Sequence, residues 1–158
     1  MLHEHVCIAV HGASVSGVEY VPAMNVGSSR WQLLKSPLYG LGAAAGDLIE
    51  IIDPSKGLFT VLKRGDNVVV QFYMARCDRD SLQATQRVAV EIEAAVGPIG
   101  GKIDGVVAGL IVSTIPVSAG FSRIESVFDG LVRWHQGGQW QYGNVYDPIT
   151  EEPLNWWS

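Results

Sequence analysis

The sequence has no long apolar segment. No apolar run reaches the roughly 18 residues that a membrane-spanning helix needs. The first residues, MLHEHVCIAVHGAS, also lack the basic region that precedes the apolar stretch of a signal peptide. Cysteine is scarce, because Cys7 and Cys77 are the only two and they form no CxxC motif. We therefore expect a cytoplasmic protein with reduced thiols and no membrane partner.

Basic residues are also few. The 158 residues include 11 Lys and Arg against 16 Asp and Glu, a net charge of −5. Residues 81–158 carry four basic and eight acidic side chains, and so hold −4 of that charge. An acidic surface repels phosphate backbones, so we expect no nucleic acid partner. The charge suits a basic protein partner, although it could simply aid solubility.

One glycine-rich stretch invites comparison with a nucleotide-binding loop. Residues 40–52 read GLGAAAGDLIEII, and their first glycines are spaced almost as in a dinucleotide fingerprint. That fingerprint needs a preceding strand and a helix whose N-terminus holds the pyrophosphate. Here the β-branched residues after Asp47 predict a strand instead of a helix. We therefore interpret the glycines as turn residues and expect no cofactor.

Alternating apolar and polar residues predict strands throughout the first part of the chain. The predicted ranges are 2–10, 18–26, 29–36, 47–53 and 58–64. Helical periodicity appears only later. Asp80 or Ser81 is expected to cap a helix that ends near residue 96, and a second helix is expected at about 122–135. Further strands are predicted at 67–74, 106–117 and 139–146, with a turn-rich link at 98–105 that could include a short strand.

These elements predict an α+β fold. Residues 1–64 would form a curved antiparallel β-sheet, barrel-like in shape. It would pack on a ferredoxin-like half with the order β-α-β-β-α-β at residues 65–147, followed by a tail at 148–158. We expect these parts to form one compact unit. The alternative is a single continuous mixed sheet.

Residues 17–52 carry a resemblance to a known family. They read GVEYVPAMNVGSSRWQLLKSPLYGLGAAAGDLIEII, with Glu19-Tyr20 near the start and Gly46-Asp47 before an apolar strand. This pattern resembles the bacterial domain of unknown function numbered 4265, over about residues 5–147 with the motif core at 19–51. Ser36 and Leu38 stand where the family usually has Asn and Phe. The resemblance implies a bacterial cytosolic protein and brings no catalytic residues with it.

Candidate catalytic or metal-binding residues are few. His3, His5 and Cys7 alternate along one strand, so they could point to one side and hold a metal ion, with His11 further along the same face. Four ligands on one strand are spread too far apart for an ordinary structural zinc site, so a plain strand face is the alternative. Cys77 lies between Arg76 and Arg79, which could activate its thiol, but Asp78 and Asp80 oppose this effect. We find no paired-acid site and expect no enzyme.

Aromatic residues are concentrated near the end of the chain. We expect Trp134 and Trp140 in the core, and leave open whether Trp156 and Trp157 pack internally or contact a partner. The acidic second half and the resemblance favour an immunity protein that neutralises a basic toxin domain by direct binding. A small-ligand sensor, or a metal-binding or enzymatic module built on His3, His5 and Cys7, is the alternative. The expected partner-binding residues are Tyr146, Asp147, Glu151, Glu152 and Trp156.

Overall fold

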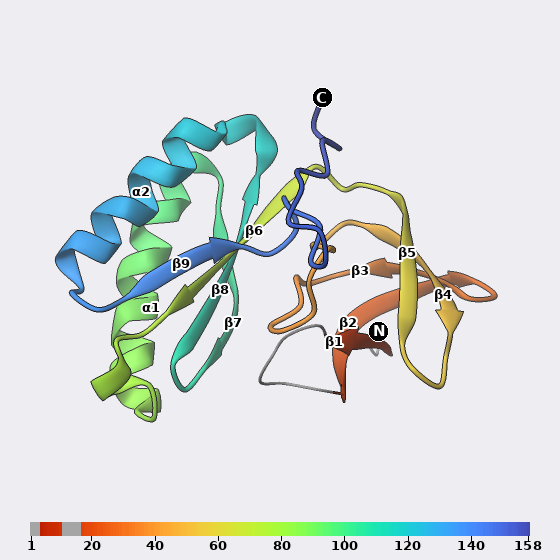
Figure 1. The fold of residues 1–158 in the computed structure, drawn as a ribbon, viewed down its shortest axis with the longest axis horizontal. Helices are drawn as coiled ribbons and strands as arrows, with labels where there is room; N and C mark the ends of the chain where they lie inside the picture. The colour runs from red at the N-terminus through yellow and green to blue at the C-terminus, as the bar shows by residue number, and fades with distance from the viewer. Residues whose placement is uncertain (1–3, 11–16) are drawn as a thin grey trace.

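The computed structural model describes residues 4–10 and 17–158 and has two antiparallel β-sheets and two α-helices. This is an α+β arrangement, as predicted, and the two separate sheets rule out the single continuous sheet. Figure 1 shows the first sheet beside the second, with both helices covering one face of the second sheet. In the described part of the chain, no helix is long and apolar enough to cross a membrane.

The first sheet is a meander in which each strand pairs with the next along the chain. Its strands are β1 (Glu4–Val10), β2 (Gly17–Gly27), β3 (Arg30–Leu33), β4 (Leu48–Asp53) and β5 (Leu58–Lys63). The inward side chains, among them Ile8, Val21 and Ile49, form its core. The barrel-like shape that we expected does not close. The Ala9 N–H bonds the Gly57 carbonyl at 2.8 Å, but this contact falls on the turn before β5, and the described residues of β1 and β5 form no ladder.

The second sheet has the strand order β7-β8-β6-β9, and all its neighbouring strands are antiparallel. Its elements are β6 (Asn67–Tyr73), α1 (Leu82–Val96), β7 (Lys102–Val107), β8 (Leu110–Pro116), α2 (Phe121–Trp134) and β9 (Gln139–Tyr142). Ser81 caps α1 as predicted, because its hydroxyl accepts the Ala84 N–H at 3.0 Å. Phe72 from β6 packs with Ile92 and Phe128 from the helices, and all three are fully buried.

Two local predictions for this half were wrong. The apolar run at 106–117 is not one strand but the end of β7, a turn and β8, because Gly109 adopts a left-handed φ of 85° and reverses the chain. Trp134 is 80% exposed instead of lying in the core. It is the last residue of α2, where the chain turns and the next side chain, His135, pairs with Glu91 on α1. Trp140 does pack against Phe128, with ring centroids 5.7 Å apart.

The loop between β3 and β4 joins the two halves, and Glu19 holds it in place. The Glu19 carboxylate accepts three consecutive backbone N–H groups, from Leu38 at 2.6 Å and from Tyr39 and Gly40 at 2.9 Å each. The carbonyl of Leu38 in turn accepts the side-chain amide of Gln71 on β6. These three backbone N–H groups are therefore occupied by a carboxylate of the same chain.

Asp47 fixes the other end of this loop. Its fully buried carboxylate accepts the backbone N–H groups of Ala44 at 3.0 Å and Gly65 at 2.8 Å and pairs with Arg64 at 3.4 Å. Burial raises the pKa of Asp47, and these hydrogen bonds and the Arg64 charge offset only part of that rise. A Cβ at Gly65 would lie 2.5 Å from the carbonyl carbon of Gly46, so this close approach requires glycine. Gly42 and Gly46 adopt left-handed φ angles of 94° and 88°, so they serve as turn residues, as predicted.

Candidate functional site

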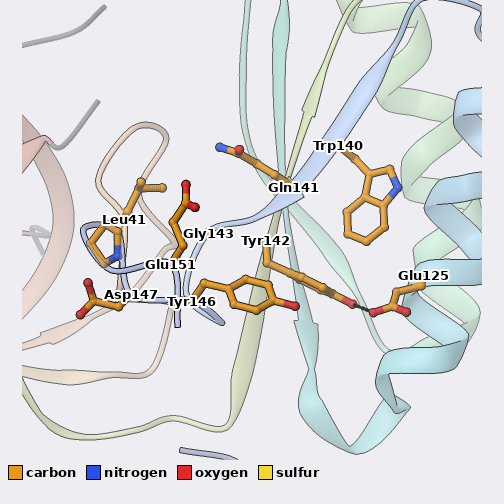
Figure 2. A pocket seen from close by; sticks show the side chains of 10 residues that line it. Leu41, Glu125, Trp140, Gln141, Tyr142, Gly143, Tyr146, Asp147 and Glu151 are labelled. Carbon is orange, nitrogen blue, oxygen red and sulfur yellow. Dashed lines mark hydrogen bonds between the residues drawn. The ribbon is translucent and has the colours of Figure 1, made fainter. Parts of the chain in front are cut away.

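A cleft of about 520 Å³ opens where the two halves meet. Leu41 reaches it from the first half, Glu125 from α2, and four consecutive residues from the end of β9 and the turn after it. Its lining consists of Leu41, Glu125, Trp140, Gln141, Tyr142, Gly143, Tyr146, Asp147, Pro148 and Glu151. Three of these residues are aromatic, three are acidic, and none of the lining residues is basic. Figure 2 shows Asp147 and Glu151 near Leu41 at one end and Glu125 at the other, with the tyrosines between them.

Helix α2 holds the aromatic side of the cleft. Tyr142 donates its hydroxyl to Glu125 at 2.8 Å, and Trp140 donates its indole N–H to Asp129 at 2.9 Å. The two acids are four residues apart, so they lie on one face of α2, above β9. The Trp140 and Tyr142 rings meet edge to face with centroids 5.0 Å apart, and Tyr146 lies 6.4 Å from Tyr142. The aromatic surface is therefore fixed in place by two carboxylates.

A tight loop holds the acidic end. Asp147 accepts the backbone N–H groups of Ile149 at 2.8 Å and Thr150 at 2.9 Å, a turn in which the side chain mimics a backbone carbonyl. The Glu151 N–H bonds the Asp147 carbonyl, and Glu151 has a φ of 62°. A non-glycine residue in this left-handed region is costly, so the surrounding bonds must hold it there. The loop thereby presents the exposed Glu151 side chain to the cleft.

The electrostatics of the cleft follow from these contacts. Burial raises the pKa of Tyr142, and the hydrogen bond to Glu125 and the negative charge of that carboxylate raise it further. The phenol therefore stays protonated and keeps donating to Glu125. The backbone N–H groups of Thr150 and Ile149 lower the pKa of Asp147. Asp147 is thus held in its charged form, so that the cleft combines aromatic faces with fixed negative charge. That combination attracts cations such as the ammonium of lysine or the guanidinium of arginine.

The structure brings three of the predicted partner-binding residues together in this cleft: Tyr146, Asp147 and Glu151. Tyr146 is 47% exposed. Glu152 is exposed but does not line the cleft. Trp156 packs inward instead: its indole N–H bonds the Asn144 carbonyl at 2.8 Å, and the Arg64 guanidinium lies 5.5 Å from its ring centroid. Partner binding by these five residues stays a prediction, and the geometry favours the first three.

The tail packs against the second half of the chain. The rings of Trp156 and Trp157 lie 5.5 Å apart, and Trp157 meets Phe121 of α2 at 5.0 Å. Both tryptophans contact the hydrophobic core of the second half. Of the two possibilities left open for this pair, internal packing is therefore the observed one.

The other sequence candidates lie elsewhere. His5 and Cys7 border a separate hollow on the first sheet together with Trp31, while His3 and His11 lie outside the described residues. Among the residues that the structure describes, no three His, Cys, Asp or Glu side chains gather as a metal site. Cys77 is exposed on a short turn of helix, and its thiol contacts Asp78.

Sequence reasoning missed Glu125, Trp140, Tyr142 and Leu41 as parts of the cleft. Only the Glu125 and Asp129 spacing gave a usable signal, since acids four apart on an amphipathic helix can meet the polar ends of aromatic residues on a neighbouring strand. Leu41 reaches the cleft only through the loop that Glu19 and Asp47 fix, and nothing in the local sequence indicates that position.

Two antiparallel sheets, helices on the second, and a cleft at their junction define an α+β protein of a known fold. The fold is similar to a crystal structure described as that of a hypothetical protein from Neisseria gonorrhoeae, with a TM-score of 0.67 and 13% identity, over 90% of this chain and 95% of that one. No curated protein matches the chain in sequence. The family model for the domain of unknown function DUF4265 matches residues 19–142. The chain belongs to that family, as the resemblance in the sequence indicated.

Proposed function

We propose that this protein is a non-enzymatic bacterial binding protein, an immunity protein that neutralises a basic toxin domain in the cytoplasm by direct contact. The observation that carries this proposal is the cleft, in which three carboxylates surround three aromatic rings. Aromatic anchors in a pocket and complementary charge are the features that give protein interfaces their affinity and their association rate. Toxins that act on nucleic acid must meet phosphates and tend to be basic, so they suit such a site.

The charge and the aromatic anchor should act on different rate constants. Glu125 and Glu151 would attract the basic partner over distance, which mainly speeds association and is screened by salt. Tyr146, half-exposed at the centre, would be buried by the partner and mainly slow dissociation. A surface whose charge only kept the protein soluble would show neither effect.

The partner to test is the product of the neighbouring gene, co-expressed and assayed for suppressed toxicity and for binding kinetics. We expect Glu125→Gln with Glu151→Gln to slow association about tenfold at low salt and to flatten its salt dependence. Glu93→Gln, an exposed acid on α1 that does not line the cleft, is the control and should leave association unchanged. Tyr146→Ala should speed dissociation by more than tenfold. The proposal fails if the neighbour is neither basic nor bound, or if the cleft variants bind as the wild type does.

A second candidate, a sensor of small cationic ligands, is favoured by the position of the cleft between two halves of the chain. Leu41 comes from the first half and the other lining residues from the second half and the tail, so a ligand could alter their relative position. Thermal-shift measurements with polyamines, guanidinium compounds and quaternary amines would test this. A saturable shift that Glu151→Gln abolishes would favour the sensor over the immunity protein.

We further assign the second half to the ferredoxin-like class. The support for this assignment is the chain order β-α-β-β-α-β and the strand order β7-β8-β6-β9.

A further inference from the structure

Strand β9 is an open edge of the second sheet. It pairs with β6 on one side, and no other strand in the described part of the chain pairs with it. Beyond its end, Gly143 donates its N–H to Val69 of β6 at 2.8 Å. Successive residues of a strand direct their backbone groups to opposite sides, so Gln141 and Gln139 also face β6. The N–H and C=O groups of Trp140 and Tyr142 therefore point away from the sheet.

The open edge and the acidic cleft are the same place. Trp140, Gln141, Tyr142 and Gly143 all line the cleft, and four consecutive residues can border one cavity only if it runs along the strand edge and not over one face. The cleft therefore combines unpaired backbone donors and acceptors with the carboxylates of Glu125 at one end and Glu151 at the other. An extended peptide is the ligand that uses both features.

We propose that an extended basic segment of a partner protein adds to β9 as a fifth strand of this sheet, with lysine or arginine side chains entering the cleft. The backbone of the segment would bond Trp140 and Tyr142, and its alternate side chains would meet the carboxylates. A second copy of this chain suits the edge poorly, because edge-to-edge pairing would bring the acidic clefts of both copies together. The inference rests on the proposed function and specifies how the cleft would recognise its partner.

Synthetic peptides with alternating lysine and valine test the backbone contribution. Two versions carry N-methyl groups, one on every lysine amide and the other on every valine amide. Methylation removes the N–H donors along one side of the strand and leaves the charge unchanged. Since only one set can face β9, we expect one methylated peptide to bind at least about tenfold more weakly than the parent and the other to bind within about twofold.

Hydrogen exchange of the protein gives the second readout. In the free protein the Trp140 and Tyr142 amides should exchange rapidly and the Gln141 amide slowly, and bound parent peptide should slow the first two. Equal binding of the two methylated peptides, or binding without protection of Trp140 and Tyr142, would overturn the edge inference. If the peptides bind in either of these ways and Glu151→Gln abolishes their binding, the cleft recognises charge without strand addition. Binding of no peptide overturns the edge inference too, while the kinetic assay with the folded basic partner decides the proposed function separately.

Discussion

Replacing Glu19 by Gln should destabilise the protein substantially, although the change is nearly isosteric. The carboxylate accepts three backbone N–H groups, two at Oε1 and one at Oε2. A glutamine amide can keep at most the two bonds at its oxygen, and its NH₂ group then faces the Leu38 N–H, donor against donor. Hydrogen bonds to charged groups contribute about 1.5–3 kcal/mol each. Because Glu19 is partly accessible to water, we expect a loss near the lower end, about 2 kcal/mol.

A loss of that size should lower the melting temperature by about 4–8 °C in a chain of this length. Urea denaturation at pH 7 measures the free energy of unfolding, and calorimetry measures the melting temperature. Glu50→Gln is the matched control, because Glu50 forms an exposed pair with Arg30, and the substitution should cost less than about 0.5 kcal/mol. If Glu19→Gln costs no more than the control, the carboxylate does not hold the loop and the reasoning is refuted.

Three further predictions concern single side chains. Asp47 has a folded-state pKa raised above 3.8, so its ionisation should reduce the free energy of unfolding as the pH rises from about 4 through that pKa. Asp47→Asn should remove this pH dependence, measured by urea denaturation at a series of pH values. The same dependence of the free energy of unfolding on pH in wild type and variant would contradict the prediction. Tyr142 should ionise well above its ordinary pKa of 10.0 in ultraviolet titrations, and Glu125→Gln should lower that pKa. The same titration curve in the variant would show that burial alone raises the pKa of Tyr142. Trp134→Ala should change stability by less than about 0.5 kcal/mol, and a larger loss would mean that its exposed ring packs in solution.

Most elements were predictable where one periodicity acted alone. Alternation of apolar and polar residues predicted β1 and β2, and Ser81 predicted the start of α1 to within one residue. The bounds of the β7–β8 hairpin were misplaced because β8 is buried from Leu110 to Ile115 and β7 ends in apolar residues, so that the end of β7 and β8 read as one apolar run. The only local signal was Gly109, a single glycine inside that run. Trp134 was misplaced because helical periodicity continues to the last residue, whereas the chain leaves the helix there and turns His135 toward Glu91.

The cleft was predictable only in part. Tyr146, Asp147 and Glu151 are close in sequence and so could be grouped before the structure was known. Glu125 reaches the cleft because α2 packs against β9, and Leu41 reaches it because the loop between β3 and β4 extends to the second half. Such long-range placements depend on how sheets and helices pack, which no local pattern records. Trp156 was predicted to bind a partner because a tryptophan near a terminus suits an interface. In the structure its indole N–H donates to the carbonyl of Asn144 in the same chain.

Two acids of the motif core and the acids that line the cleft have different roles. Glu19 and Asp47 of the motif core are occupied by backbone N–H groups of their own chain. These two acids hold the joint between the two halves, which is a property of the fold and not of a ligand. The family match ends at Tyr142, whereas the loop with Asp147 and Glu151 follows it. A loop outside the matched residues can set partner preference without altering this joint. We therefore expect that exchanging residues 146–152 between two family members transfers partner preference without loss of stability, measured by binding and urea denaturation of the chimera. Retention of the original preference would place recognition elsewhere.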